Sequence, residues 1–98
     1  MQTFAMLTRL DRSGPQRPVD ELETEVVERV GEECPKVKWL GSFAVLGPHD
    51  YLDLFSASDC EEAMKVASIV RSFGHAETET WPVVEWKRFK KVAAKMHA

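Results

Sequence analysis

Two neighbouring segments of this chain, residues 37–46 and 51–57, have the pattern of β-strands that are apolar on both faces. The turn between them is Gly-Pro-His-Asp at positions 47–50. Pro48 presets φ for the second position of a turn, but it cannot adopt the positive φ of a tight two-residue hairpin. We therefore expect a wider loop, with a bulge, between two antiparallel strands. Because both faces are apolar, something must cover each side of the sheet.

The remainder of the chain alternates between strand and helix patterns. Ser58 and Glu61 form a capping box before the second helix, and Gly74 suits the position after its end. In chain order, the expected elements are a strand at 3–8, a loop at 10–18, a helix at 19–32, strands at 37–46 and 51–57, a helix after Ser58, a strand at 75–81 that Pro82 stops, and a helix at 84–96. This βαββαβ order with one added helix predicts an α+β, ferredoxin-like fold.

Such a fold places both main helices on one face of a four-stranded antiparallel sheet and leaves the other face bare. Apolar residues on the bare face predict a homodimer through that open face, in which two sheets form a dimeric α/β barrel. The last helix is expected to turn one side inward, with Trp86, Phe89, Val92, Ala93 and Met96. Its basic outer side is either a solvated face or a contact for an anionic partner.

Composition narrows the class of protein. The 98 residues predict a single domain over 1–98, and the net charge of −3 disfavours a nucleic-acid binder. Residues 1–10 lack the features of a signal peptide, no run is long enough to span a membrane, and two cysteines do not make a disulfide framework. A cytoplasmic protein is therefore expected. No cofactor or metal motif is present, so neither is predicted.

The strongest candidates for chemistry lie at and after the turn. His49 and Asp50 could form an acid/base pair, because a carboxylate beside an imidazole raises the histidine pKa. Alternatively, Asp50 accepts hydrogen bonds from backbone N–H groups and His49 is simply exposed. Asp53 interrupts an apolar strand, and alternation gives it the face of Tyr51 and Phe55. Leu52 and Leu54 then take the opposite face, which we expect the helices to cover.

Glu77 and Glu79 share one face of the last strand with Trp81, whereas Ala76, Thr78 and Thr80 suit the helix side. If both glutamates face the barrel interior, they could form a carboxylate cluster with Asp53 and a nearby histidine, which could bind a metal or work as an acid/base site. The alternative is an edge strand whose glutamates meet water. An apolar pocket for a hydrophobic or aromatic ligand could be lined by Trp39, Phe43, Tyr51 and Phe55, although such a set could equally be the dimer core.

The run LGSFAVLGPHDYLDLFSASD, followed by a helix and FGHAETETW, resembles the GYD-domain family of the dimeric α/β-barrel class. The family motif Gly-x-Tyr-Asp falls on positions 47–50, with His49 in place of the tyrosine, and Thr78 and Thr80 match a later threonine pair. Asp53 stands where the family is usually apolar. The resemblance implies paired sheets that share a barrel with an internal pocket. Relatives in the superfamily include cofactor-free oxygenases, lactone isomerases, ligand-sensing domains and stress-response proteins.

These observations predict a homodimeric small-molecule-binding or interaction domain. The alternative is a cofactor-independent oxygenase or isomerase in which His49 and Asp53 handle protons. A closed cavity lined by Asp53, with His49 at its mouth, would favour the enzyme.

Overall fold

The computed structural model describes residues 1–11, 13, 17–73 and 76–96. The elements in chain order are β1 (Gln2–Leu10), α1 (Val19–Glu33), β2 (Lys38–Ala44), β3 (Tyr51–Ala57), α2 (Cys60–Ser72), β4 (Ala76–Val83) and α3 (Trp86–Met96). The predicted βαββαβα order is confirmed. Gly74 and His75, expected to end the second helix and to begin the last strand, lie outside the described residues, as does part of the loop at 10–18.

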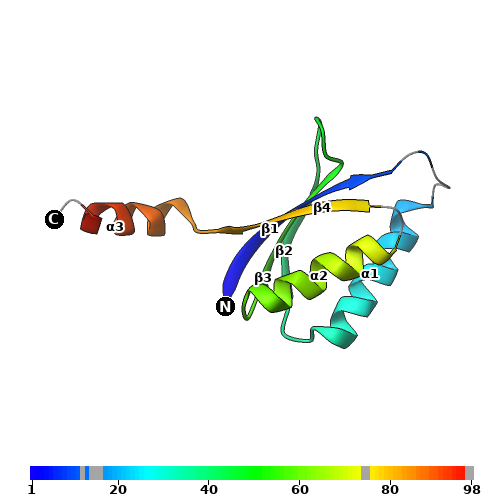
Figure 1. Ribbon diagram of the computed structural model, residues 1–98, viewed down its shortest axis with the longest axis horizontal. Helices are drawn as coiled ribbons and strands as arrows, with labels where there is room; N and C mark the ends of the chain where they lie inside the picture. The colour runs from blue at the N-terminus through cyan, green and yellow to red at the C-terminus, as the bar shows by residue number, and fades with distance from the viewer. Residues whose placement is uncertain (12, 14–16, 74–75, 97–98) are drawn as a thin grey trace.

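The four strands form one antiparallel sheet in the order β2-β3-β1-β4. Helices α1 and α2 lie on the same side of this sheet, and the other side is left without a helix (Figure 1). Strand β4 is therefore an edge strand. This agrees with the alternative in which Glu77 and Glu79 lie on an edge strand. Strand β4 continues past Pro82 to Val83, because proline is tolerated at a sheet edge where one side of the strand needs no ladder hydrogen bond.

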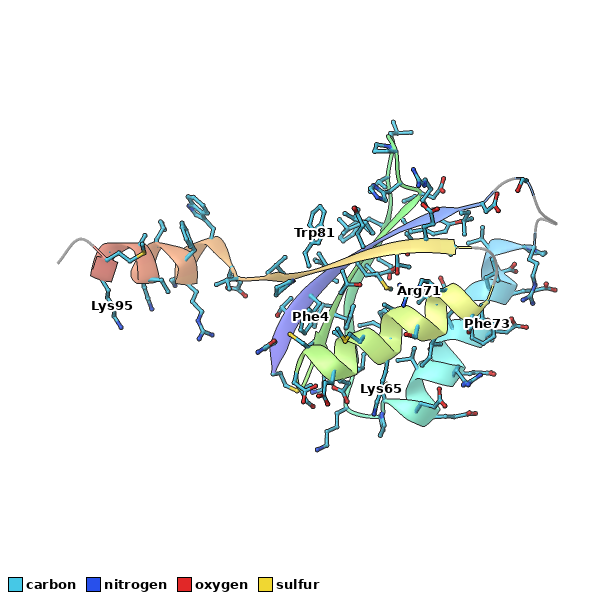
Figure 2. All side chains as sticks on the ribbon, in the orientation of Figure 1. Phe4, Lys65, Arg71, Phe73, Trp81 and Lys95 are labelled. Atoms are coloured by element: carbon cyan, nitrogen blue, oxygen red, sulfur yellow. The ribbon has the colours of Figure 1, made fainter. Side chains whose placement is uncertain are left out.

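The hydrophobic core lies between the sheet and the two helices. At its centre, the rings of Phe4 and Phe55 stack with centroids 5.7 Å apart, and neither side chain is more than 2% exposed. The residues that complete this core are Met6, Ala57, Val30, Cys34, Ala63, Val66, Ala67 and Ile69. Figure 2 shows Phe4 on the helix side of the sheet and Trp81 on the opposite side.

The structure reverses one predicted assignment of faces. Phe55 and Asp53 pair with Phe4 and Met6 of β1, so Tyr51, Asp53 and Phe55 face the helices. Leu52 and Leu54 belong to the open face, and the prediction that helices cover them is wrong. The sequence could not decide between the faces, because both are apolar and period-2 alternation gives no direction.

A bulge at Leu40 changes the alternation along β2. Trp39 pairs with Phe55 and Gly41 pairs with Leu54, so Leu40 has no partner of its own in the register. An extra residue moves every following side chain to the other face. Trp39 is consequently on the helix side, whereas Phe43 pairs with Leu52 of the open face. Regular alternation along 37–46 predicts that Trp39 and Phe43 share one face, and the bulge makes that prediction wrong.

The loop between β2 and β3 spans 45–50 and is wider than a two-residue hairpin, as Pro48 predicted. Gly47 has φ of +128°, a conformation that side chains with a Cβ rarely adopt. The backbone N–H of Val45 donates to the carbonyl of Asp50 at 3.0 Å and closes the loop.

Helix α2 begins one residue later than the capping box predicted. Asp59, not Ser58, is the N-cap, and its carboxylate accepts from the backbone N–H of Glu62 at 2.9 Å. The Glu62 carboxylate accepts in turn from the N–H of Ser58 at 2.7 Å. The reciprocal pattern is thus present, shifted by one position.

Helix α3 projects from the end of β4 away from the sheet and both other helices (Figure 1). It begins at Trp86 instead of Val84, and the prediction that its apolar side faces the chain's own core is wrong. Trp86 is 71% exposed and Met96 is 73% exposed. In the part of the chain that the structure describes, none of the helices has the length and apolar character needed to cross a bilayer.

Replacement of the central ring of the core tests this packing. We expect Phe55→Ala to lower the free energy of unfolding by about 3–5 kcal/mol, because the side chain is fully buried and leaves a cavity. Chemical denaturation measures the change. The control Leu46→Ala removes a fully exposed side chain and should change stability by less than about 0.5 kcal/mol. Equal effects of the two substitutions would contradict this account of the core.

Candidate functional site

A cavity of about 510 Å³ lies between α1 and the helix-covered face of the sheet. We call it the α1 cavity. Most of its wall is apolar, and the polar groups that reach it come from three strands and one helix. Its lining consists of Met6, Thr8, Leu10, Val19, Leu22, Glu23, Val26, Val27, Trp39, Ser42, Phe43, Ala44, Tyr51, Asp53, Val70, Phe73 and Ala76.

The cavity exists because α1 packs closely at one end only. Val30 and Cys34, at the C-terminal end of α1, are 1% exposed and belong to the core. Toward the N-terminus, Leu22 and Val26 face the cavity and are only half-buried. The helix therefore diverges from the sheet toward its N-terminus, and its apolar stripe forms the cavity wall instead of closing over the strands.

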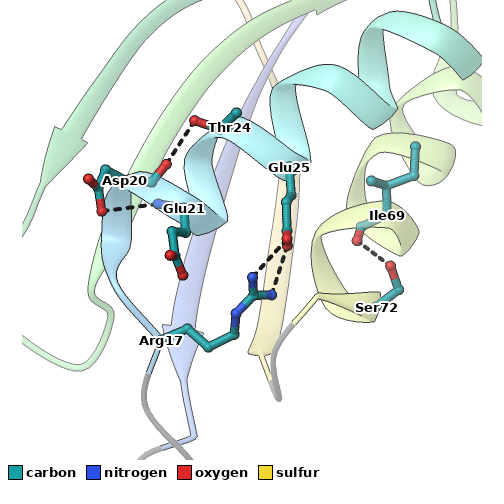
Figure 3. A network of polar contacts seen from close by, with 7 residues as sticks. All are labelled: Arg17, Asp20, Glu21, Thr24, Glu25, Ile69 and Ser72. Atoms are coloured by element: carbon teal, nitrogen blue, oxygen red, sulfur yellow. Dashed lines mark hydrogen bonds and ion pairs between the residues drawn. The ribbon is translucent and has the colours of Figure 1, made fainter.

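Polar contacts link the residue before α1 to the first turns of that helix (Figure 3). The Arg17 guanidinium donates two hydrogen bonds, of 2.7 and 2.8 Å, to the Glu25 carboxylate two helical turns into α1. This bidentate contact holds the pKa of Glu25 below its usual value. Pro18 is the N-cap and supplies no side-chain hydrogen bond to the helix. The Arg17–Glu25 contact is therefore a side-chain link between α1 and the residues that precede it.

Asp53 is the most unusual group in the cavity wall. It lies on β3 opposite Met6, under α1. Burial raises the pKa of its carboxyl, a hydrogen bond from the Ser42 hydroxyl opposes the rise, and the negative charge of Glu23 adds to it. Ser42 stands directly across from Asp53 in the β2–β3 register. The result is a carboxyl group that is partly removed from water and has no cationic neighbour among the residues that line the cavity.

Thr8 supplies a second polar group, which sequence reasoning missed. The side chain is 3% exposed and lines the cavity, and its hydroxyl makes no hydrogen bond to any described residue. A buried hydroxyl without a partner costs free energy. The hydroxyl of Thr80, on the same side of the sheet, is also buried and also has no hydrogen-bond partner among the described residues. No sequence signal marks Thr8, since a threonine in a strand is ordinary and its burial depends on three other elements.

The structure brings together part of the predicted aromatic set. Trp39, Phe43 and Tyr51 line the α1 cavity, although the β2–β3 register assigns Phe43 to the open face. Phe55 lies in the core beneath, with its ring 5.7 Å from that of Trp39. These residues therefore surround a cavity within one protomer, and not the interior of a barrel shared by two sheets.

Glu77 and Glu79 lie on the open face, opposite to Asp53, so the carboxylate cluster considered from the sequence does not form. Glu77 forms an ion pair with Arg9, its neighbour in the β1–β4 register. The His49 Nε2 atom lies 3.1 Å from the Glu79 Oε2 atom. Within the described residues, no group of three His, Cys, Asp or Glu side chains could hold a metal ion.

Asp50 accepts a hydrogen bond from a backbone N–H group, as predicted by the alternative in which this residue has a structural role. Its Oδ2 atom accepts from the backbone N–H of Leu10 at 2.9 Å, and its own N–H donates to the carbonyl of Thr8 at 2.8 Å. These contacts tie the 45–50 loop to the end of β1. His49 reaches the open face, where it meets Glu79, whereas Asp53 faces the helices. One protomer therefore does not bring His49 to the mouth of the cavity that Asp53 lines.

A second hollow, of about 590 Å³, lies beside the 45–50 loop. It is lined by Arg9, Leu10, Asp11, Gly47, Pro48, Asp50, Ala76 and Glu77. Arg9 and Glu77 pair with each other, and Asp50 contacts Leu10, so these polar groups already have partners within the chain. The α1 cavity differs because the Thr8 hydroxyl within it has none.

Comparisons with known proteins agree with this fold. The model of the GYD domain family matches residues 4–93, whereas no curated protein matches the chain. Among solved structures, a leucine response regulatory protein from Mycobacterium tuberculosis is similar with a TM-score of 0.59 and 15% identity, over 86% of this chain and 51% of that one. The feast or famine regulatory protein of the same organism, complexed with L-methionine, has a TM-score of 0.60 and 15% identity, over 87% of this chain and 51% of that one.

This chain thus spans about half the length of the two structures that it resembles. At such low identity the likeness concerns the fold alone. Together with the strand order β2-β3-β1-β4, it confirms the predicted ferredoxin-like α+β fold.

The raised pKa of Asp53 has a measurable consequence for stability. A carboxyl with a higher pKa in the folded than in the unfolded chain destabilises the fold once it ionises. The free energy of unfolding should therefore lose a contribution as pH rises from about 4, the usual aspartate value, through the raised value. Asp53→Asn lacks this titration, so its stability relative to the parent should increase over that window and then level off.

Denaturation curves across pH, at one protein concentration, measure this difference. The control Asp59→Asn changes an exposed N-cap carboxylate, and asparagine caps helices about as well as aspartate. Curves for Asp53→Asn and the parent that stay parallel across pH would show that Asp53 is not held in an unfavourable environment.

Proposed function

We propose that this chain, which belongs to the GYD domain family, is a homodimeric small-molecule-binding domain whose ligand occupies the α1 cavity. The cavity carries the proposal. Its volume falls within the roughly 300–1,000 Å³ typical of ligand sites, and its wall is largely apolar with a few convergent polar groups. The feast or famine regulatory protein, which has a similar fold, is a complex with L-methionine, so a small ligand is compatible with domains of this shape.

The homodimer is proposed from the surfaces that one chain leaves uncovered. On the open face, Phe43 is 53% exposed and Trp81 is 51% exposed, and Leu7, Leu52 and Leu54 are half-buried. The exposed Val84 and Trp86 continue this apolar surface from β4 into α3. A helix of 11 residues is marginal in isolation, so α3 needs a surface to pack against.

The charge distribution favours a second copy of this chain as that surface. Five of the thirteen Lys and Arg residues lie in α3, and all sixteen Asp and Glu residues lie outside it. A second copy therefore offers both an apolar open face and an acidic exterior to the basic, amphipathic α3. This complementarity supports a dimer in which the open faces meet and α3 extends onto the partner.

Filling the cavity tests the proposed ligand site. Val26 lines the cavity from α1, and Val26→Phe should occupy much of the space that a ligand needs. Fragment-sized compounds that give a saturation-transfer NMR signal with the parent should lose it with this variant. The control Met64→Phe adds a ring at an exposed position on α2, outside the cavity and the open face, and should retain binding. Fragments that bind both variants equally would place their site elsewhere and remove the basis of the proposal.

The oligomeric state is tested by light scattering on the complete chain. We expect a mass twice the 11.1 kDa of one chain at micromolar concentration. Leu52→Lys puts a charge in the middle of the open face and should produce monomers. Met64→Lys changes an exposed side chain on α2 and should leave the dimer intact. A monomeric parent, or a Leu52→Lys variant that still dimerises, would contradict the proposed interface.

A further inference from the structure

The charged groups of the α1 cavity all carry the same sign. Among the described residues that line it, only Glu23 and Asp53 are charged, and both are carboxylates. Glu23 lies on the exposed side of α1, whereas Asp53 lies beneath the helix. Lysine, arginine and histidine do not occur among the lining residues that the structure describes. A ligand that brings its own carboxylate or phosphate would therefore meet only repulsion and desolvation.

Two polar residues of the wall are diagonal neighbours on one face of the sheet. Asp53 pairs with Met6, and Tyr51 pairs with Thr8, so Asp53 and Thr8 are diagonal neighbours on the helix side of the β1–β3 pair. Such neighbours are roughly 7–8 Å apart, and both residues line the α1 cavity. The Thr8 hydroxyl, which has no partner among the described residues, can accept a hydrogen bond, as can the Asp53 carboxylate.

We propose that the α1 cavity binds an amine with an apolar body, whose ammonium group donates hydrogen bonds to the Asp53 carboxylate and the Thr8 hydroxyl. This rests on the proposed function, because it assigns a ligand class to the same cavity. A bound cation supplies the opposite charge that Asp53 lacks, and it satisfies the unpaired hydroxyl at the same time. The apolar body would lie against the stripe of α1 and the aromatic side chains of Trp39 and Phe73.

The choice of an amine follows from the Asp53 carboxylate, which has no counter-charge among the described residues that line the cavity. Ser42 stands across from Asp53 in the β2–β3 register and is neutral, so it supplies no counter-charge to the carboxylate. Among the described residues, Arg9 of β1 and Arg17 just before α1 pair with Glu77 and Glu25, neither of which lines the cavity. Within the part of the chain that the structure describes, no cation lines the cavity beside Asp53, and a bound amine would supply one.

A series of three compounds with similar apolar bodies tests the ligand class: phenethylamine, 2-phenylethanol and 3-phenylpropionate. We expect phenethylamine to bind the complete protein at pH 7.5 at least about tenfold more tightly than 3-phenylpropionate, with the alcohol between them. Isothermal titration or ligand-observed NMR gives the dissociation constants. The cavity-filled Val26→Phe protein should bind none of the three.

Two variants separate the role of the charge from the integrity of the cavity. Asp53→Asn should weaken binding of phenethylamine about tenfold or more and leave 2-phenylethanol within about twofold. Thr8→Val removes the hydroxyl at nearly constant volume and should weaken amine binding several-fold, by about the value of one hydrogen bond. Unchanged binding of the alcohol in both variants shows that the cavity has kept its shape.

The outcomes distinguish this inference from the proposed function. If 3-phenylpropionate binds as tightly as phenethylamine, or if Asp53→Asn weakens all three compounds equally, the assignment to amines is overturned. The proposed function survives that result provided that the bound compounds lose their site in Val26→Phe. If none of the three binds, the assignment to amines is also overturned, and the proposed function then depends on the fragment test alone.

Discussion

The stacked rings of Phe4 and Phe55 are the contact on which the rest of this structure depends. They lie on the two central strands of the sheet, and the core residues of α1 and α2 pack over them. Because β1 and β3 pair in fixed register, burial of these two rings determines the face of every other residue on both strands. Asp53 and Thr8 are carried to the helix side as a consequence, although neither is apolar.

The packing that closes the core at one end of α1 leaves it open at the other. Val30 and Cys34 seat the C-terminal end of the helix, and the N-terminal half stands over Asp53 and Thr8 without filling the space. A better-packed helix would bury more apolar surface and gain stability. The cavity, the partly buried carboxyl and the unpaired hydroxyl are each unfavourable for the isolated chain, and they coincide at one place. Binding sites commonly combine such costs, because a ligand relieves them together.

The open face and α3 differ from the cavity in the shape and extent of their exposed apolar surface. There the uncovered surface is broad, apolar and continuous from the sheet into an unsupported helix, which is the character of a contact between proteins and not of a site for a small molecule. The His49 and Glu79 contact lies on this side, together with the pair of Arg9 and Glu77. These polar groups lie at one end of the open face, beside the 45–50 loop, where β1 ends and β4 begins.

Much of the architecture follows from local patterns in the sequence. Helix periodicity, the acidic start of α2 and the two-faced apolar strands around Pro48 were sufficient to predict the order of elements and the ferredoxin-like sheet. The width of the 45–50 loop also followed, because the ring of Pro48 restricts its own φ. Chain-local chemistry controls each of these features, so the sequence by itself determined them.

Tertiary structure decided everything that required knowing which face of a strand points inward. With both faces apolar, only the packing of Phe4 against Phe55 and the helices places Asp53 under α1 and Leu52 outside it. The bulge at Leu40 then separated Trp39 from Phe43, and alternation alone contains no trace of that extra residue. The burial of Thr8 and the projection of α3 likewise depend on distant segments, since burial is a property of what packs against a residue and not of the residue itself.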